Sequence, residues 1–543
     1  MDFERAARAW LEIDSDSDNQ KELQVLLAAG DKAGLADRFG SRLQFGTAGL
    51  RAALGAGPNR MNRIVVAQTA LGLARFLSAN RESYLDSDGE LSVVIGHDAR
   101  KKSDEFAQES AAVLAAAGIR VRKFEQLVAT PIVAFTAKRL GASAAVMVTA
   151  SHNPREDNGY KVYLGGIGGG SQLTSPADSE ISAAIAEVVA DEALSFASIP
   201  RSGDFEVLGQ DAVEAYLQRA LQLENSSESD LRICHTAMHG VGWLFLQPLL
   251  KRAGFSQVEP VAEQQLPDGA FPTLPFPNPE EPGALDIALR TANQMQCELI
   301  LATDPDADRL AAVVLHRGNW RMLSGDELGL LLGERVASRN KAGTLATSIV
   351  SARQLELVAK EHGLDFASTL TGFKWISKVP GLVFGYEEAL GYCVDPRFTP
   401  DKDGLTAALT LARLAAELKP LGKTLIDALE ELAERYGHFA TRQISIRLDS
   451  QRAVGELMAR LRQNLSTDKP HEIDSVADWL ENSEPQRRTD ALEMSGSGWR
   501  ILVRPSGTES KLKCYVHASA SSTKQAESRL EAAAQLATRL LSD

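Results

Sequence analysis

A serine that could do chemistry lies in residues 149–154, which read Thr-Ala-Ser-His-Asn-Pro and follow the apolar run 144–148. An apolar run that stops at Ser, His, Asn and Pro is typical of a buried strand that ends in a tight loop. Loops at the carboxyl ends of strands in α/β sheets usually hold ligands. Ser151 is therefore a hydroxyl that could carry a covalent group. The same residue types also form ordinary turns, and this stretch alone favours that simpler interpretation.

Three aspartates occupy alternate positions of a second loop, residues 303–309 (Thr-Asp-Pro-Asp-Ala-Asp-Arg). Asp304, Asp306 and Asp308 would project to one side of an extended loop and offer hard oxygen ligands to a divalent cation. An EF-hand needs glycine at the sixth position of its loop and glutamate at the twelfth. Those positions hold Arg309 and Leu315 here. The pattern favours a metal site of another kind over a solvated acidic turn.

Two further loops have the composition of anion-binding sites. Residues 45–51 (Phe-Gly-Thr-Ala-Gly-Leu-Arg) join glycines, whose N–H groups can approach an anion closely, to Arg51, which could clamp it. Residues 504–510 (Arg-Pro-Ser-Gly-Thr-Glu-Ser) combine an arginine, hydroxyls and a glycine amide, and Lys511 and Lys513 follow. The first loop fits a plain glycine turn equally well. In a chain that is acidic as a whole, the second predicts a phosphate cradle rather than a plain hairpin turn.

A pair of carboxylates marks residues 385–392, which read Gly-Tyr-Glu-Glu-Ala-Leu-Gly-Tyr. Carboxylate oxygens accept hydrogen bonds well, and their setting between glycines and aromatic rings suits the recognition of sugar hydroxyls. A structural loop between a strand and a helix explains the same residues equally well.

The elements that would position the first loops alternate between strand and helix. Residues 91–95 predict a strand, and a helix with Ser103 as its N-cap and Gly118 at its end follows. A second helix begins at Thr130, has proline in its first turn, and ends before Gly141. This alternation predicts βαβ units and a mainly parallel sheet.

The remainder of the chain repeats these signals. Residues 231–234 and 298–302 predict strands of a second α/β unit, and Ser324 with Glu327 forms a capping box for the first helix of a third. Strands at 499–503 and 511–517 predict a final α+β unit. The expected domains are therefore residues 1–204, 205–322, 323–439 and 440–543. Residues 1–40 predict a helical extension whose packing residues are Trp10, Leu11, Leu23, Val25, Leu26 and Leu27.

Composition excludes several classes of protein. A length of 543 residues suggests three to four domains, and the formal net charge of −14 leaves no excess of basic residues for nucleic acid. No apolar run approaches the 18 residues or so of a membrane span, and the first residues do not resemble a signal peptide. The widely spaced cysteines favour free thiols in a reducing compartment, and we expect a cytoplasmic protein. They are Cys234, Cys297, Cys393 and Cys514.

Taken together and in order, these loops resemble those of the α-D-phosphohexomutase superfamily, which includes phosphoglucomutase and phosphomannomutase. The resemblance covers nearly the whole chain: a serine loop at 149–154, a metal loop at 304–309, a sugar loop at 385–392 and a phosphate loop at 504–508. The helical extension and the forms of residues 45–51 and 385–392 are similar to the branch with phosphoglucomutase-2 and phosphopentomutase. The resemblance implies three similar α/β domains and a C-terminal α+β domain around a central active-site cleft.

The resemblance also implies roles for individual residues. Ser151 matches a phosphoserine, and Asp304, Asp306 and Asp308 match residues that hold Mg²⁺ against it. The candidate catalytic residues are Ser151, Lys161 (proton transfer or charge stabilisation), Arg51 and His152, of which His152 is better placed to orient than to act as a base. The candidate substrate-binding residues are Arg309, Thr371, Gly372, Lys374, Glu387, Arg504, Ser506, Gly507 and Thr508.

The activity implied is interconversion of glucose 1-phosphate and glucose 6-phosphate through phospho-Ser151 and a bisphosphorylated sugar, primed by glucose 1,6-bisphosphate. Many hexose enzymes have serine two positions after the sugar-binding glutamate, where this chain has Ala389. This departure keeps phosphomannomutase and phosphopentomutase as alternatives, beside a bisphosphate synthase or a phosphatase. We expect sugar phosphates as the only partners, no nucleic acid or membrane, and a monomer or weak homodimer.

Overall fold

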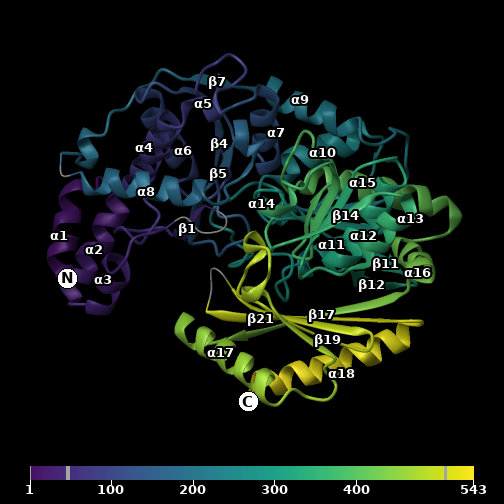
Figure 1. Ribbon diagram of the computed structural model, residues 1–543. Coiled ribbons are helices and arrows are strands. Elements are labelled where there is room, and N and C mark those ends of the chain that lie inside the picture. The colour runs from purple at the N-terminus through teal and green to yellow at the C-terminus, as the bar shows by residue number, and fades with distance from the viewer. Residues whose placement is uncertain (1, 45–48, 192, 507–509, 543) are drawn as a thin grey trace. The chain divides into compact units, whose positions relative to one another are not determined.

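The computed structural model describes residues 2–44, 49–191, 193–506 and 510–542. Figure 1 shows the chain coloured from its N-terminus to its C-terminus, with its helices and strands labelled. The contacts divide the chain into two compact units. Unit 1 comprises Met1–Leu323 and Gly391–Pro420, and unit 2 comprises Ser324–Leu390 and Leu421–Asp543. The chain therefore leaves unit 1 after Leu323 and returns to it for thirty residues before completing unit 2.

Three helices form the N-terminal extension: α1 (Phe3–Ile13), α2 (Ser17–Ala29) and α3 (Lys32–Phe39). Each begins after an aspartate whose side chain accepts hydrogen bonds from the first-turn N–H groups. Leu23 and Leu35 are fully buried between the helices. The predicted helical extension is thus confirmed. The packing role of Val25 was wrong, because its side chain is 67% exposed.

The first sheet has the strand order β1-β5-β4-β2-β3-β7, with β6 beside β5. Strands β4, β2, β3 and β7 run parallel, whereas β5 is antiparallel to both β4 and β1. The strands are β1 (Leu50–Ala53), β2 (Ser92–His97), β3 (Arg120–Phe124), β4 (Ala144–Val148), β5 (Asp157–Leu164), β6 (Ser171–Gln172) and β7 (Glu206–Leu208). The helices are α4 (Arg63–Ala79), α5 (Arg81–Tyr84), α6 (Ser103–Ala116), α7 (Thr130–Leu140), α8 (Ala177–Ala190) and α9 (Gln210–Leu221).

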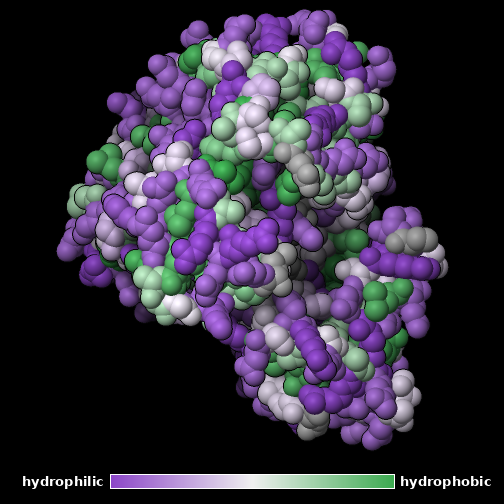
Figure 2. All heavy atoms as spheres, turned by 90° about the vertical axis from the view of Figure 1, so that its left-hand side faces the viewer, coloured by the Kyte–Doolittle hydropathy of each residue, from purple (hydrophilic) through white to green (hydrophobic). Residues whose placement is uncertain are grey.

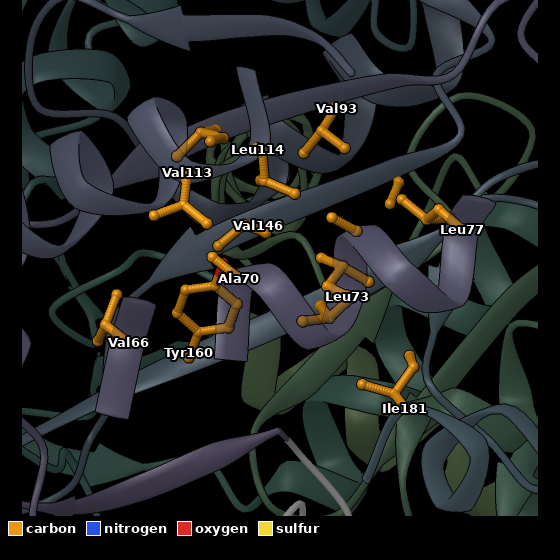
Figure 3. Close-up of a cluster of buried hydrophobic side chains, with 14 of the residues drawn as sticks. Val66, Ala70, Leu73, Leu77, Val93, Val113, Leu114, Val146, Tyr160 and Ile181 are labelled. Atoms are coloured by element: carbon orange, nitrogen blue, oxygen red, sulfur yellow. The ribbon is translucent and has the colours of Figure 1, made fainter. Parts of the chain in front are cut away.

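One face of this sheet packs against α4 and α6. Figure 3 shows α4 directing an apolar row toward Val93 of β2, Val146 of β4 and Tyr160 of β5. The row consists of Val66, Ala70, Leu73 and Leu77, spaced three or four residues apart as on one side of a helix. Because strand residues alternate between faces, Val94 and Met147 belong to the other face, where α7 contacts β2 and β4.

The predicted N-cap of α6 was wrong. Lys102, in a left-handed conformation with φ 65°, occupies the N-cap position without a side-chain cap, and Ser103 is the first helical residue. The Ser103 hydroxyl instead donates to Asp98 Oδ1 at 2.8 Å. A tertiary partner thus uses the hydroxyl that the local pattern assigns to the helix terminus.

The second sheet of unit 1 has the order β12-β11-β10-β8-β9. The central strands β10, β8 and β9 are parallel, and β11 and β12 are added in antiparallel fashion. The bounds are β8 (Ile233–Thr236), α10 (Gly242–Arg252), β9 (Val258–Pro260), α11 (Asp286–Gln294), β10 (Leu299–Thr303), β11 (Leu310–His316) and β12 (Asn319–Met322). The returning segment contains β16 (Gly391–Cys393), which is not a strand of this sheet, and α15 (Gly404–Leu418), which contacts α10.

Unit 2 contains the parallel strands β14-β13-β15 and an antiparallel sheet, β17-β21-β20-β19-β18. The first group comprises α12 (Gly325–Ala337), β13 (Thr344–Ser348), α13 (Gln354–His362), β14 (Asp365–Thr369), α14 (Phe373–Ile376), β15 (Leu382–Glu387) and α16 (Leu425–Tyr436). The second comprises β17 (His438–Arg447), α17 (Gln451–Thr467), β18 (Ser475–Asp478), β19 (Leu492–Gly496), β20 (Trp499–Pro505), β21 (Lys511–Ala520) and α18 (Thr523–Ser542).

A small apolar cluster joins the two parts of unit 2. Ile349 and Val350, which follow β13, pack with Leu502 of β20 and Tyr515 of β21. The capping box predicted at Ser324 and Glu327 is confirmed, with both reciprocal hydrogen bonds present.

The fold class is confirmed as three α/β parts followed by an α+β part. Strand β7 lies beyond residue 204 yet pairs with β3, so the first sheet extends past the expected first boundary. The domain boundaries and the central cleft stay predictions.

On the face drawn in Figure 2, hydrophobic side chains are scattered in small groups among hydrophilic ones. Within the described part of the chain, no helix combines the length and the apolar character needed to cross a bilayer.

Candidate active site

Ser151 lies directly beyond β4 in a left-handed backbone conformation, with φ 51°. This conformation is uncommon for residues other than glycine, and it must be held by the surroundings. The Ser151 N–H donates to Thr149 Oγ1 at 2.9 Å. The Ser151 hydroxyl donates to Asp304 Oδ2 at 2.8 Å and lies 3.2 Å from Nδ1 of His152. The serine loop and the metal loop, far apart in the sequence, therefore meet at one hydroxyl.

Arg100 holds the serine loop in place, a role that the sequence analysis did not predict for it. Its side chain is almost fully buried, and its two terminal nitrogens donate to four backbone carbonyls at 2.7–2.9 Å. The four acceptors are the carbonyls of Ser151, Asn153, Pro154 and Asp157. The guanidinium group of one arginine thus fixes the whole turn between β4 and β5.

Asp98 completes this support. Its carboxylate accepts from the Arg100 N–H at 3.0 Å, from the Thr149 hydroxyl at 2.6 Å and from the Ser103 hydroxyl. Burial raises the pKa of Asp98, and Arg100 and Thr149 oppose that effect. Because Thr149 also accepts from the Ser151 N–H, Asp98 and Arg100 act together on the nucleophile's backbone.

We expect Arg100→Lys to lower turnover about 10- to 100-fold and the free energy of unfolding by about 2–4 kcal/mol. A single ammonium cannot reach four carbonyls, and each buried carbonyl left without a partner costs about 1–3 kcal/mol. Turnover and chemical denaturation measure the two effects. Arg155→Lys is the matched control, because Arg155 lies in the turn that Arg100 holds but is about half exposed and ion-paired with the neighbouring Glu156. Equal behaviour of the two variants would refute the positioning role.

Asp304, Asp306 and Asp308 form a buried cluster, each with an exposed fraction of 0%. One oxygen from each lies within 4.8 Å of the others. Asp306 Oδ1 and Asp308 Oδ1 are buried without a hydrogen-bond partner in the described chain. Buried carboxylate oxygens without donors are costly unless a cation binds them, so these residues fit a divalent metal.

Asp306 is held by the N-terminus of α7. The Thr130 N–H donates to the Asp306 carbonyl at 2.9 Å, and the Thr130 hydroxyl donates to Asp306 Oδ2 at 2.6 Å. A carboxylate at a helix N-terminus is also favoured by the helix dipole. The helix that begins at Thr130 therefore joins the first sheet to the metal loop.

Close backbone approaches shape the metal loop. A Cβ atom added at Gly240 would lie 2.3 Å from Cα of Pro305, and one added at Gly404 would lie 2.3 Å from the carbonyl oxygen of Arg309. Ala307, between the aspartates, has φ 57°. Only glycine permits such contacts without displacement of the backbone. Gly240 and Gly404 therefore allow neighbouring segments to pack closely against the metal loop and limit its movement.

Two lysines neutralise part of the cluster's charge. Lys161 Nζ lies 2.7 Å from Asp308 Oδ2 and 3.3 Å from Asp306 Oδ2, and Lys402 Nζ lies 3.3 Å from Asp308 Oδ2. Burial alone would lower the pKa of Lys161, but Asp308 and Asp306 outweigh it and the pKa is raised. Burial raises the pKa of the Asp308 carboxyl, but Lys161, Lys402 and Arg309 more than reverse this and lower it.

Arg51 and Arg309 face the same cluster. Arg309 Nε lies 4.0 Å from both Asp304 Oδ2 and Asp308 Oδ1. Strand β1 pairs with β5 so that Arg51 lies opposite Gly159, two residues before Lys161. Burial lowers the pKa of Arg51, and Asp306 and Asp308 oppose this effect. Burial, Arg309 and Arg51 hold the pKa of His152 well below its usual value, so its imidazole is neutral.

Unit 2 carries the remaining candidate residues. Glu387 ends β15 and is half-buried; Glu388, which follows it, accepts from the hydroxyls of Ser348 and Ser351 at 3.1 Å each. Burial, Glu387 and Asp326 raise the pKa of Glu388 to about 7. The second carboxylate of the pair, Glu388, is thus held by two hydroxyl donors that the sequence analysis did not predict.

The raised pKa of Glu388 has a testable consequence for stability. Its proton is bound more tightly in the folded state than in the unfolded state, where the pKa is near 4.5. The stabilisation is therefore complete below about pH 4.5 and is lost as pH rises through about 7, with an upper limit of about 3 kcal/mol for a half-buried group.

We expect Glu388→Gln to gain stability relative to the native chain between pH 5 and pH 8, because the amide never becomes charged. Denaturant unfolding at both pH values measures this. Glu356→Gln is the control, because that side chain is 49% exposed and ion-paired with Arg353. A relative stability of Glu388→Gln that does not change with pH would contradict the expectation.

The start of the predicted phosphate cradle lies in unit 2 as well. Arg504 is in β20, and the N–H of Ser506 donates to the carbonyl of Lys511 at 2.8 Å. Burial and Glu388 raise the pKa of the Tyr515 hydroxyl, while Arg504 lowers it. Tyr515 is therefore close enough to Glu388 and to Arg504 to interact with the charge of each. Parts of the sugar loop and of the phosphate loop thus lie near the same tyrosine within unit 2.

The other predicted residues are placed as follows. Gly372, with φ 110°, is the N-cap of the short helix α14, and Lys374 within it is buried with Nζ 5.4 Å from the Trp375 ring centroid. Thr371 is half-buried just before them. Residues 45–48 of the glycine loop, with Gly507 and Thr508, lie outside the described residues. Unit 1 thus groups Ser151, His152, Lys161, Arg51, Arg309 and the three aspartates.

Four profiles of one family match the chain in order. They are described as phosphoglucomutase/phosphomannomutase alpha/beta/alpha domain I (residues 42–191), domain II (213–318), domain III (324–436) and the C-terminal domain (461–535). These matches cover well over half of the chain. The chain belongs to the phosphoglucomutase/phosphomannomutase family.

Relatives within this family carry several names. The "Probable phosphomannomutase" of Haemophilus influenzae is 44% identical, over 86% of this chain and 95% of the relative. Human phosphopentomutase is 34% identical, over 93% of this chain and 90% of the relative. The predicted superfamily and branch are thus confirmed. Phosphomutases are isomerases that move a phosphate within one substrate, and this enzyme class is confirmed too.

The fold is shared with solved members of the family. The open form of the Paramecium phosphoglucomutase pp63/parafusin superposes with a TM-score of 0.69 at 16% identity, covering 92% of this chain and 96% of that one.

Proposed function

We propose that this phosphomutase interconverts glucose 1-phosphate and glucose 6-phosphate through a phosphoryl group carried on Ser151. The observation that carries the proposal is the hydrogen bond from the Ser151 hydroxyl to Asp304, within an acidic cluster where two buried oxygens have no hydrogen-bond partner among the described residues. A hydroxyl so placed can carry a phosphoryl group whose oxygens face cations.

Two balanced transfers complete the proposed cycle. In the first, the P–O bond to Ser151 Oγ breaks while a P–O bond forms to the free hydroxyl of the sugar monophosphate, giving a bisphosphate. In the second, the P–O bond to the other sugar oxygen breaks while a P–O bond to Ser151 Oγ forms, which restores the phosphoserine and releases the product. The sugar hydroxyl loses a proton in the first transfer and the released hydroxyl gains one in the second, so protons balance over the cycle. Glucose 1,6-bisphosphate would prime a chain whose Ser151 is unphosphorylated.

The residues of unit 1 have distinct parts in this proposal. Arg51 and Arg309 would stabilise the phosphoryl group during transfer, and Lys161 would place a buried positive charge near the reacting hydroxyl. Asp304, Asp306 and Asp308 would hold Mg²⁺. The chemistry that a bound Mg²⁺ supplies there is neutralisation of negative charge on the phosphoryl oxygens.

The residues of unit 2 would bind the part of the substrate that does not react. Glu387 would accept hydrogen bonds from sugar hydroxyls, and Arg504, Ser506, Gly507 and Thr508 would hold the second phosphate. Thr371, Gly372 and Lys374 would help to distinguish the two orientations of the sugar.

A pentose phosphate is the second candidate substrate. It is supported by the similarity to human phosphopentomutase along nearly the whole chain and by Ala389, which lacks the hydroxyl found in many hexose enzymes. The phosphomannomutase name of the bacterial relative supports a hexose instead.

A coupled assay with Mg²⁺ and glucose 1,6-bisphosphate tests the proposal. It compares kcat/KM for glucose 1-phosphate, mannose 1-phosphate and ribose 1-phosphate. The highest value for glucose supports the proposal, while a preference for mannose or ribose replaces the substrate and keeps the mechanism. Release of inorganic phosphate without isomerisation would indicate a phosphatase, and accumulation of the bisphosphate would indicate a synthase.

A further inference from the structure

A small cavity of about 270 Å³ lies in unit 2 at the beginning of β20. Its walls include Arg353, Glu493, Trp499, Arg500 and His517. The phosphate loop follows the other end of the same strand. Because a strand rises about 3.3 Å per residue, seven residues separate the two places by about 20 Å. The cavity is therefore distinct from the predicted phosphate cradle.

The side chain of His517 indicates that the cavity suits a polar ligand. The side chain is only 8% exposed, and neither ring nitrogen makes a hydrogen bond within the described chain. Burial and the nearby Arg500 lower its pKa to about 3, although the backbone of Val350 opposes this. The ring is therefore neutral. One ring nitrogen faces the backbone of Val350 without good hydrogen-bond geometry, and neither nitrogen has a hydrogen-bond partner in the described chain. Buried polar groups are rarely left so, and a ligand that offers both kinds of partner would satisfy them.

Two guanidinium groups give the cavity its charge. Arg500 lies directly across from His517 in the pairing of β20 with β21, so the two side chains share one face of the sheet. Arg353 precedes α13. Burial lowers the pKa of Arg500, Glu493 opposes this effect, and the positive charge of Arg353 adds to it. Glu493 Oε1 lies 3.9 Å from Arg500, beyond hydrogen-bond distance. Arg353 also pairs with Glu356, whose Oε2 lies 3.5 Å from Arg353 Nε at an exposed position. An anion between the two guanidinium groups would relieve the repulsion that remains between them.

We propose that this cavity binds a small phosphate monoester that carries hydroxyl groups. The phosphate would lie between Arg353 and Arg500 with His517 as an additional donor. Glu493, held in place by the indole N–H of Trp479 at 3.2 Å, would accept a hydroxyl of the ligand. The volume lies just below the usual range of about 300–1,000 Å³ for ligand pockets and excludes a nucleotide.

A short chain of contacts connects this cavity to the sugar loop. Arg500 donates to the carbonyls of Ile349 at 2.9 Å and Ser351 at 3.1 Å. The Ser351 hydroxyl in turn donates to Glu388 and accepts from the N–H of Glu388. A ligand that draws Arg500 toward its phosphate would alter the segment that supports Glu388. This regulatory consequence rests on the proposed function, whereas binding itself does not.

Calorimetry on the full chain tests binding, with glycerol 3-phosphate as the probe and glycerol and inorganic phosphate for comparison. We expect Arg353→Gln and His517→Leu to weaken binding of glycerol 3-phosphate at least about tenfold. Arg353→Gln is the safer variant because its side chain is 59% exposed. Arg452→Gln, at a position 88% exposed in unit 2, is the matched control. Arg504→Gln distinguishes this cavity from the predicted phosphate cradle, because any binding of glycerol 3-phosphate that it removes belongs to the cradle. The binding that is lost in Arg353→Gln should remain in Arg504→Gln.

Unchanged affinity in Arg353→Gln, or loss of all binding in Arg504→Gln alone, would overturn the proposal, as would the absence of heat with every probe. Equal binding of inorganic phosphate would overturn the role of Glu493. In the mutase assay, glycerol 3-phosphate should change the KM of the sugar phosphate by one factor in the native chain and by a different factor in the Arg353→Gln variant. Equal shifts would overturn the connection to Glu388.

Discussion

Replacement of Ser151 by alanine is expected to lower turnover by at least about 10⁴-fold, because the covalent route loses its only carrier. Binding of the sugar phosphate should persist, since the substitution leaves the charged side chains of the site unchanged. Label from a bisphosphate donor should no longer be incorporated into the protein. Steady-state assays, calorimetry and phosphoprotein mass spectrometry measure the three effects.

Ser182→Ala is the matched control for this substitution. Ser182 lies in α8 of the same unit, and its hydroxyl donates only to the carbonyl of Asp178 within that helix. The control should retain activity and labelling. Turnover by Ser151→Ala at the level of Ser182→Ala would refute the phosphoserine mechanism.

The second large effect is expected for Asp306→Asn, which preserves shape but removes one negative charge from the acidic cluster. We expect the Mg²⁺ concentration for half-maximal activity to rise at least about tenfold and kcat/KM to fall by about 10²- to 10³-fold, because carboxylates are the preferred ligands of Mg²⁺. Removal of divalent cations with a chelator should abolish activity in the native chain, with recovery on addition of Mg²⁺.

Asp211→Asn provides the comparison, because Asp211 is exposed in the first turn of α9. Its Mg²⁺ dependence should match that of the native chain. A chain whose activity resists chelation, or an Asp306→Asn variant with native Mg²⁺ dependence, would contradict the metal site.

The sequence predicted those parts of the site that lie within single loops. The apolar run 144–148 is β4 residue for residue, and the loop beyond it places the Ser151 hydroxyl on Asp304 of the aspartate loop. These predictions succeeded because a buried strand and its terminal turn are encoded by local patterns of apolar and turn-forming residues.

The supporting residues could not be predicted in the same way, because tertiary contacts decide their roles. Arg100 was visible only as a cation after a strand, and nothing local shows that it binds four carbonyls more than fifty residues later. Lys402 pairs with Asp308 across about ninety residues, within a charged Asp-Lys-Asp run that also reads as a helix terminus. Ser103 fits a helix N-cap by composition, but Asp98 binds its hydroxyl.

The return of Gly391–Pro420 to unit 1 limits how this gene can be divided. A stop codon after Leu323 would preserve Ser151 and all three aspartates, yet it would remove Lys402 and the whole of α15. Neither unit is a contiguous stretch of coding sequence, so each depends on translation of the other to be complete. A nonsense allele anywhere before codon 402 therefore removes a cation from the acidic cluster, even where every residue of the serine and aspartate loops is still made.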